Sequence, residues 1–304
     1  MSLFAFPALT AGPPSRRNWY QELLDHPDCH GPQQVFEAYS SHRDAYLSKS
    51  LATFTSPHNP VSPDQALLSH LQRLSNTQHP SESSTSDLAN FEVNCLGFSA
   101  RPSPAVISTI HTIQSHITAL VGQDFYPMPA EHLHIAILEL AHRHTLSYLY
   151  TISASVGPAR LQKMLDLINT CPSKPRLVSP RLSLDVMGVA LTFLPSTKQE
   201  YTYHHLRAEM HAIALESGEK FDMCYTAPSA HVTVGRFVGN GFCEEGEKRR
   251  VFIELVEEIN EELGRDGGKE DGWVLCEEGG MELQAGYLKY GVDREKADML
   301  GREV

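Results

Sequence analysis

Histidine occurs in two stretches that otherwise alternate between polar and apolar residues, about a hundred positions apart. Residues 231–237 read His-Val-Thr-Val-Gly-Arg-Phe, and residues 132–140 read His-Leu-His-Ile-Ala-Ile-Leu-Glu-Leu. Such alternation predicts β-strands in which every second side chain points to the same face. In the later strand we expect that face to carry His231 and Thr233. In the earlier strand we expect it to carry His132, His134 and Ala136.

Two histidines that face one substrate can divide acid and base catalysis between them. The unperturbed imidazole pKa of about 6.5 lets histidine take and give protons near neutrality. One ring can activate a nucleophile while the other protonates the leaving group. A hydroxyl two residues farther along the same face, as Thr233 is from His231, can bond a substrate oxygen at a spacing of about 6–7 Å. This design suits in-line displacement at phosphorus, which needs an acid and a base on opposite sides of the phosphorus atom.

The two stretches resemble the motifs of the 2H phosphoesterase superfamily, the LigT-like and cyclic-nucleotide-phosphodiesterase-like proteins, which carry two H-x-[T/S] motifs on strands. The run His-Val-Thr-Val at 231–234 fits the second motif. The run His-Ile-Ala-Ile-Leu-Glu at 134–139 is similar to the family's H-x-T-x-x-E sequence, with Ala136 where threonine or serine belongs. The resemblance covers roughly residues 88–292.

The resemblance implies an α+β chain with the bilobal 2H-phosphoesterase-like fold, in which two pseudo-symmetric antiparallel-sheet lobes with outer helices meet at a central groove. It implies a hydrolase that opens 2′,3′-cyclic phosphates or related RNA-end phosphodiesters without a metal or other cofactor, although some relatives ligate RNA ends instead. By this resemblance His134 and His231 are the catalytic pair and Thr233 binds a phosphate oxygen. The implied partner is a small phosphate-bearing ligand, such as a cyclic nucleotide or an RNA 3′ end.

Ala136 departs from the family pattern because it has no hydroxyl to donate to a phosphate oxygen. Loss of one such donor costs on the order of 10²–10³ in rate, by analogy with an oxyanion donor. Three alternatives follow: another donor substitutes for it, the substrate differs, or the chain is a catalytically impaired ligand-binding or scaffold protein that keeps the groove. Candidate donors are His132, Tyr126 and Tyr148. In another register, His132 is the catalytic residue and His134 takes the hydroxyl position.

A metal site is a competing interpretation of the earlier stretch. His132, His134, His142 and His144 form two H-x-H pairs, and zinc sites do use histidines that converge from neighbouring elements. No nearby acidic or cysteine ligand completes a known spacing, and the last two histidines are expected in solvent past the end of the strand. We therefore expect no metal ligands, and a zinc-dependent hydrolase is the weaker hypothesis.

Two further side-chain positions follow from periodicity. Arg236 is an odd number of residues from His231, so strict alternation directs it to the opposite face of the sheet. His204 and His205 are neighbours in a predicted helix, where adjacent side chains point about 100° apart. We expect both of these histidines at the surface.

Strand and helix signals divide the chain into three parts. Residues 1–87 form a partly helical N-terminal extension that ends in the polar run Ser-Glu-Ser-Ser-Thr-Ser-Asp at 81–87, a flexible linker. Residues 88–292 form the 2H phosphoesterase-like domain, and residues 293–304 form a C-terminal tail. Within the domain no GxGxxG or P-loop motif follows a predicted strand, so a nucleotide-binding parallel sheet has no support and an antiparallel α+β architecture is favoured.

Serine followed by proline marks two helix starts, because the serine can serve as N-cap and proline fits the first turn. These starts are Ser62 and Ser103. The helix that begins after Ser103 repeats apolar residues with a period close to 3.6 and is expected to end at Gly122.

The formal net charge of the 304-residue chain is −12, which argues against an extended surface for nucleic acid or anionic membranes. A small phosphate-bearing ligand needs only a local pocket. No apolar run approaches the ~20 residues that span a bilayer, and the N-terminus lacks the basic start and long apolar core expected of a signal peptide. The six cysteines are scattered without a CxxC pair, which favours reduced thiols and a cytoplasmic location over a disulfide framework.

Overall fold

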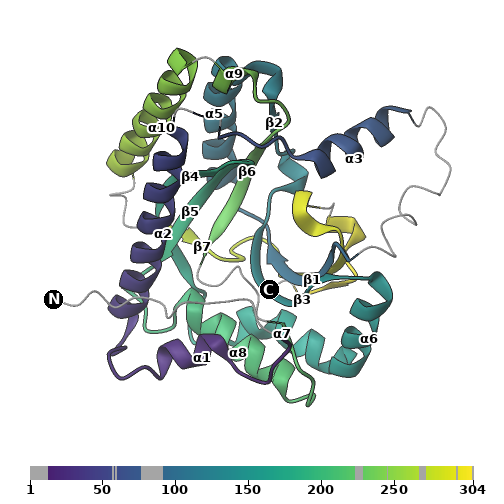
Figure 1. Cartoon of the computed structure of the whole chain (residues 1–304). Helices are drawn as coiled ribbons and strands as arrows, with labels where there is room; N and C mark the ends of the chain where they lie inside the picture. Colours follow the sequence, from purple (N-terminus) through teal and green to yellow (C-terminus); the bar gives the residue numbers. More distant parts are fainter. Residues whose placement is uncertain are drawn as a thin grey trace.

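The computed structural model describes residues 13–56, 58, 60–76, 92–222, 229–244, 246–266, 272–291 and 294–302. In these residues the chain forms an α+β fold with a mostly antiparallel nine-stranded sheet and surrounding helices (Figure 1). The predicted α+β class is confirmed. The flexible linker predicted at 81–87 lies outside the described residues.

The strands are β1 (Asn94–Ala100), β2 (Phe125–Pro127), β3 (Ile135–His144), β4 (Arg176–Asp185), β5 (Gly188–Pro195), β6 (His231–Phe237), β7 (Trp273–Val274), β8 (Glu282–Gly286) and β9 (Met299–Leu300). The helices are α1 (Trp19–Leu24), α2 (Pro32–Phe54), α3 (Gln65–Asn76), α5 (Pro104–Val121), α6 (Leu146–Val156), α7 (Pro158–Thr170), α8 (Tyr203–Leu215), α9 (Gly241–Glu244) and α10 (Gly246–Asp266). Single 3₁₀ turns are η1 (Gly122–Asp124), η2 (Ala130–His132), η3 (Leu288–Tyr290) and η4 (Arg294–Lys296). Among the described helices, none has both the length and the apolar character needed to cross a membrane.

The two histidine-bearing strands are neighbours in the middle of the sheet. The strands lie in the order β7-β4-β5-β6-β3-β1-β8-β9, and β2 also pairs with β6. Strand β3 pairs along its length with β1, and β6 pairs along its length with β5. Between them, β3 and β6 meet antiparallel at the pair Ile135 and Val232. Residues about a hundred positions apart are thus brought side by side by the sheet order.

One face of the sheet is apolar and packs into the core. Ile135 and Val232 are fully buried, as are Phe98, Leu182 and Leu191 on the strands to either side. Helices α5, α6 and α10 contact these strands. Burying a side chain of this size stabilises the fold by about 1.5–3 kcal/mol relative to leaving it exposed, so this face holds the sheet against the helices.

The long N-terminal helix α2 packs on the same core as the sheet. Tyr39, Leu47 and Phe54 of α2 are buried there, and the Phe54 ring contacts the rings of Phe237 in β6 and Phe252 in α10. Helix α2 runs alongside β4 and β5 (Figure 1). It therefore lies beside β4 and β5, the two strands next to β6 in the sheet.

One of the two predicted helix starts is confirmed. Ser103 caps α5 by accepting a hydrogen bond on its side chain, and Gly122 ends the helix with a φ of 66°. The other start is wrong by two residues, because α3 begins at Gln65 instead of residue 63. Its cap is Asp64, whose carboxylate accepts a hydrogen bond from a backbone N–H in the first turn, while Ser62 uses its own N–H to bond the loop between β4 and β5.

His204 is buried, and its predicted surface position is wrong. Only 1% of the residue is exposed; its Nδ1 lies 3.1 Å from the Tyr39 hydroxyl and its Nε2 lies 2.8 Å from the Tyr20 carbonyl oxygen. Helices α1 and α2 supply these partners and cover this side of α8. His205 is half-buried and accepts a hydrogen bond from the Thr202 backbone at the start of α8. The N-terminal helices that bury this face lie far away in the sequence.

His211, on the same helix, has an expected effect on acid stability. It is 3% exposed, packs edge-on against the rings of Tyr20 and Phe221, and has no hydrogen-bond partner on either ring nitrogen among the described residues. Burial lowers the pKa of His211 to about 4. The unfolded chain therefore takes up a proton first, near its ordinary pKa of about 6.5. Stability from this group is present above that pH and is lost as pH falls toward 4.

The variant His211→Phe should remove this loss. We expect it to raise the free energy of unfolding by about 2 kcal/mol more at pH 5 than at pH 7.5, as measured by urea denaturation at both pH values. The exposed His111 of α5 provides a matched control, since His111→Phe should give the same small change at both. An equal effect of His211→Phe at the two pH values would contradict a buried neutral imidazole.

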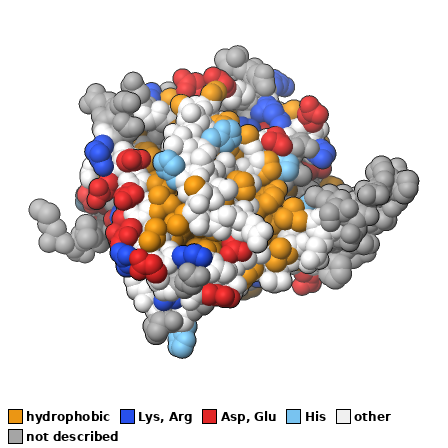
Figure 2. All heavy atoms as spheres, turned by 90° about the horizontal axis from the view of Figure 1, so that it is seen from above, with side chains coloured by type: hydrophobic (Ala, Val, Ile, Leu, Met, Phe, Trp, Pro, Cys, Tyr) orange, Lys and Arg blue, Asp and Glu red, His pale blue; other side chains and the backbone are white. Residues whose placement is uncertain are grey.

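Acidic side chains gather on the solvent side of α10. Figure 2 shows them toward the left of the view, where this helix lies. The exposed members are Glu254, Glu257, Glu258, Glu261 and Glu262. They account for part of the negative charge of the chain and lie away from the histidine strands.

Candidate functional site

A row of polar and small side chains crosses the sheet on the face opposite the core. Because Ile135 and Val232 are paired and both point into the core, their sequence neighbours point to the other face. His134 and Ala136 therefore share that face with His231 and Thr233. We call it the polar face; its other members, by strand register, are Cys95, Gly97, Ser99, Glu139, His142, Ser183, Asp185, Gly188, Ala190, Thr192, Arg236, Glu282, Gln284 and Gly286.

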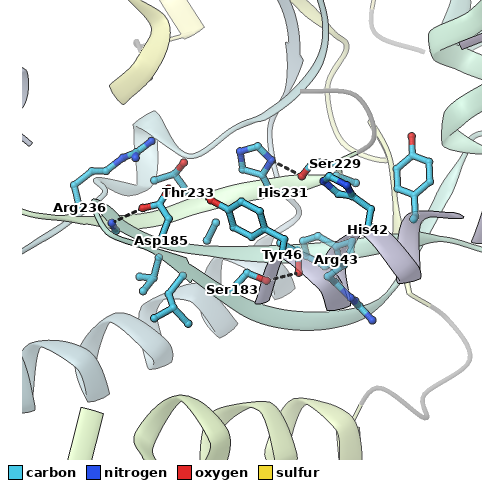
Figure 3. A pocket seen from close by; sticks show the side chains of 17 residues that line it. His42, Arg43, Tyr46, Ser183, Asp185, Ser229, His231, Thr233 and Arg236 are labelled. Atoms are coloured by element: carbon cyan, nitrogen blue, oxygen red, sulfur yellow. Dashed lines mark hydrogen bonds between the residues drawn. The ribbon is translucent and has the colours of Figure 1, made fainter. Parts of the chain in front are cut away.

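Arg236 lies on the polar face, and the prediction that it faces the other side is wrong. The register of β6 on β5 shifts between Thr233 and Gly235, so β6 carries an extra residue there, as in a β-bulge. Gly235 is required because a Cβ at this position would lie 2.2 Å from the ring of Phe125. The extra residue reverses the alternation, and Arg236 lines the same cavity as His231 (Figure 3).

Both central histidines are held through Nδ1 by groups two residues earlier in the chain. The Nδ1–H of His134 donates to the carbonyl oxygen of His132 at 2.9 Å. The Nδ1 of His231 lies 2.9 Å from the hydroxyl oxygen of Ser229 (Figure 3). Since a carbonyl only accepts, the neutral His134 ring carries its proton on Nδ1 and its lone pair on Nε2. In both residues Nε2 is the nitrogen that can act on a ligand.

Both histidines are neutral at neutral pH in the absence of a ligand. Burial, followed by the positive charge of Arg236, lowers the pKa of His231 to about 4. The pKa of His134 is lowered chiefly by burial, with a further contribution from the charge of Arg101. A bound phosphate would raise the pKa of both histidines, because an adjacent negative charge favours the imidazolium.

A cavity of about 250 Å³ opens beside His231. Strands β4, β5 and β6 form one side, and α2 forms another with Tyr39, His42, Arg43 and Tyr46 (Figure 3). His134 does not line this cavity; it lies immediately before Ile135, the first residue of the neighbouring strand β3. The strand predicted from residue 132 therefore begins three residues later. The two histidines thus lie on either side of the boundary between the adjacent strands β6 and β3.

The cavity has a cationic character suited to an anion. The Nε atoms of Arg43 and Arg236 are buried without a hydrogen-bond partner among the described residues. Burial lowers the pKa of Arg43 to about 10, so the guanidinium is still charged at neutral pH, and it donates a hydrogen bond to the Ser179 carbonyl at 2.6 Å. The carboxylate of Asp185, also in the lining, accepts from the backbone N–H groups of Met187 and Gly188. Nothing in the local sequence of α2 signals this role.

The donors that sequence analysis considered in place of a hydroxyl at position 136 lie in different places. Tyr126 pairs with Arg236 across β2 and β6, so it stands on the polar face. Tyr148 is directed away from it, because its ring stacks at 4.1 Å on His144, which lies on the opposite face of β3. His132 belongs to η2, and its backbone carbonyl orients His134.

The four histidines of the first stretch do not form one cluster. His142 Nδ1 lies 3.0 Å from Glu139 Oε2 and 3.2 Å from Cys95 Sγ, and these contacts raise the pKa of His142 to about 10. His144 Nε2 lies 2.7 Å from Asp222 Oδ2. The expectation that these two histidines lie past the strand is wrong, because β3 continues to His144. No sequence spacing signals the cysteine beside His142, because the neighbouring strand β1 supplies it.

No family model and no curated protein matches this chain. Two solved structures are similar in part. A conserved protein of unknown function from Agrobacterium tumefaciens is 12% identical, with a TM-score of 0.42 over 72% of this chain and 93% of that one. Usb1 from Kluyveromyces marxianus, solved with uridine monophosphate, is 14% identical, with a TM-score of 0.37 over 68% of this chain and 99% of that one. Neither similarity assigns a function to this chain.

Proposed function

We propose that this chain is a metal-independent phosphoesterase that opens 2′,3′-cyclic phosphates or related RNA-end phosphodiesters, with His134 and His231 as its acid–base pair. The observation that carries the proposal is the position of the two rings on the polar face, diagonal to one another across the Ile135–Val232 pair. Diagonal neighbours on adjacent antiparallel strands are about 7–8 Å apart. This separation leaves room for one phosphate between two catalytic nitrogens.

In the proposed step, His134 is the general base and His231 the general acid. The Nε2 lone pair of His134 takes a proton from water as the water oxygen bonds to phosphorus. The bond from phosphorus to one ribose oxygen breaks, and the protonated His231 gives that oxygen a proton. The product is a 2′- or 3′-phosphomonoester, with atoms and charge balanced and no oxidant or metal required. The phosphate charge raises the pKa of His231 toward the value that acid catalysis needs.

Two more residues of β6 would hold the phosphate. The Thr233 hydroxyl, two residues along the same face from His231, can donate to a phosphate oxygen. The Arg236 guanidinium, with its buried Nε, can neutralise charge that develops during displacement. The cavity between β5 and α2 would take the remainder of a small ligand, a nucleoside in the favoured case.

The experiment that tests this proposal is hydrolysis of the four 2′,3′-cyclic nucleoside monophosphates by the purified chain with a chelator present. Phosphomonoester release that persists in chelator supports the proposal. Absence of hydrolysis with every one of these substrates and with a short RNA ending in a cyclic phosphate would overturn it.

A specific observation favours a second candidate, a ligand-binding protein that uses the same face. Ala136 stands where the first motif needs a hydroxyl, and its backbone carbonyl is held by the Tyr203 hydroxyl at 2.9 Å. Such a protein would bind a cyclic nucleotide through the cationic cavity without turnover. Binding without hydrolysis, measured by calorimetry on the same ligands, distinguishes it from the enzyme.

The variant Ala136→Thr tests whether the missing hydroxyl limits an enzyme. We expect it to raise kcat by about 10²-fold, the size of one oxyanion-type donor. Ala136→Val is the matched control, because valine has nearly the same shape without the hydroxyl. A rise of equal size in both variants, or none in the threonine variant, would contradict a role for a donor at this position and would favour the binding protein.

A further inference from the structure

Three ligating side chains of different chemistry converge on the polar face, several residues along β3 from His134. They are Cys95 of β1 and Glu139 and His142 of β3. Their ligand atoms all lie within 4.8 Å of one another. The proposed phosphoesterase chemistry uses none of the three.

The spacing of these atoms is close to that of a metal coordination sphere. A tetrahedral zinc ion with bonds of about 2.0–2.3 Å to nitrogen, oxygen and sulfur sets its ligand atoms about 3.3–3.6 Å apart. Here His142 Nδ1 is 3.2 Å from Cys95 Sγ and 3.0 Å from Glu139 Oε2. An ion at the centre would require movements of only a few tenths of an ångström on these two edges.

A catalytic triad of cysteine, histidine and glutamate does not fit this geometry. In such a triad the thiol and the carboxylate bond opposite nitrogens of the imidazole, so that the ring can pass a proton between them. In this cluster both groups approach the same atom, Nδ1 of His142. One nitrogen with at most one proton cannot serve as a relay. Three ligand atoms within 4.8 Å of one another can hold a cation once the imidazole and the thiol release their protons to bind it.

Backbone irregularities in β3 bring the side chains of this cluster together. Glu139 and His142 are three residues apart, and regular alternation would turn them to opposite faces. The register shift of β3 against Leu96 and Gly97 of β1 corrects this, so that both share a face with Cys95. The strand end is fixed because Asp222 accepts a hydrogen bond from the backbone N–H of His142 at 3.1 Å.

We propose that Cys95, Glu139 and His142 form a binding site for a zinc ion. Thiolate and imidazole ligands favour zinc over magnesium and calcium, which prefer all-oxygen sites. The side chains of Glu139 and His142 are 13% and 30% exposed, so an ion can enter and a water molecule can occupy a fourth position, as in zinc sites with three protein ligands. The site is separate from the His134–His231 pair, and either assignment can fail without the other.

Metal binding to the full chain tests the proposal without an activity readout. After removal of metal with a chelator, calorimetric titration with zinc is expected to give one tight site. Titration with cobalt is expected to give the absorption band of charge transfer from thiolate to cobalt. Cys95→Ser should abolish that band and weaken zinc binding by more than the roughly 10–100-fold that loss of an outer-shell partner costs. Glu139→Gln and His142→Gln should weaken zinc binding in the same way.

Two matched variants separate this cluster from other thiols and imidazoles. Cys171→Ser changes a partly buried cysteine outside the cluster, and His144→Gln changes a histidine whose ring contacts Asp222. Both should keep the cobalt band and the zinc affinity. Circular dichroism checks the fold of each variant. If Cys95→Ser does not fold, the loss of zinc affinity in Glu139→Gln is the test. No tight zinc site in the parent chain, or a cobalt band that survives in Cys95→Ser, would overturn the proposal.

Discussion

Replacement of His231 by alanine is expected to lower kcat for cyclic-phosphate hydrolysis by about 10²–10⁴-fold, the range that one positioned acid or base contributes. His134→Ala should cause a loss of similar size. The reason is geometric: each ring is fixed through Nδ1, so Nε2 is the nitrogen that would transfer the proton, and alanine removes it. Initial rates at saturating substrate, with the chelator present, measure the effect.

The double variant His134→Ala/His231→Ala makes the test sharper. Residues that act as one catalytic unit give losses that do not add, so the double variant should be little slower than either single one. His111→Ala, at an exposed position of α5, is the control for loss of a histidine as such and should keep full activity. Turnover that survives in either single variant at the parent rate would exclude the two-histidine mechanism.

Several features of this site follow from local sequence because neighbouring residues alone decide them. Alternation from His231 to Val234 is enough to place a histidine and a threonine on one face of a strand. Ser103 and Gly122 mark the ends of α5 through capping rules that act within one turn. The α+β class likewise follows from the arrangement of strand and helix signals along the chain.

Other features depend on contacts between distant segments, which periodicity cannot report. Arg236 reaches the polar face because β6 carries an extra residue between Thr233 and Gly235, which reverses the alternation. Beside this bulge, the ring of Phe125 leaves room only for glycine at position 235. His204 is buried because α1 and α2 cover its helix. In each case a distant segment of the chain determines the position of the side chain, and the neighbouring residues in the sequence predict a different position.

Loss of Arg101 is expected to cause the largest fall in stability of any single change at the site. Its guanidinium forms two hydrogen bonds of 2.9 Å each to the carboxylate of Glu282, which is fully buried. It also donates to the backbone carbonyls of Glu131 and Leu133, which lie three residues and one residue before His134. Removing Arg101 leaves the buried carboxylate dependent on the longer contact to Arg294, and breaking a buried ion pair in this way costs about 3–5 kcal/mol. We expect that loss for Arg101→Met in urea denaturation, together with a fall in kcat measured well below the unfolding temperature.

A matched pair of variants tests whether the buried carboxylate is the cause. Arg294 contacts Glu282 by a single longer interaction of 3.3 Å and is more exposed, 29% against 17% for the Arg101 side chain, so Arg294→Met should cost clearly less. The double variant Arg101→Met/Glu282→Met also removes the buried carboxylate that has lost its main partner, and it should be more stable than Arg101→Met alone. It should not recover kcat, because the two carbonyls before His134 still lack their donor. A double variant less stable than Arg101→Met would show instead that packing around Glu282 outweighs its charge.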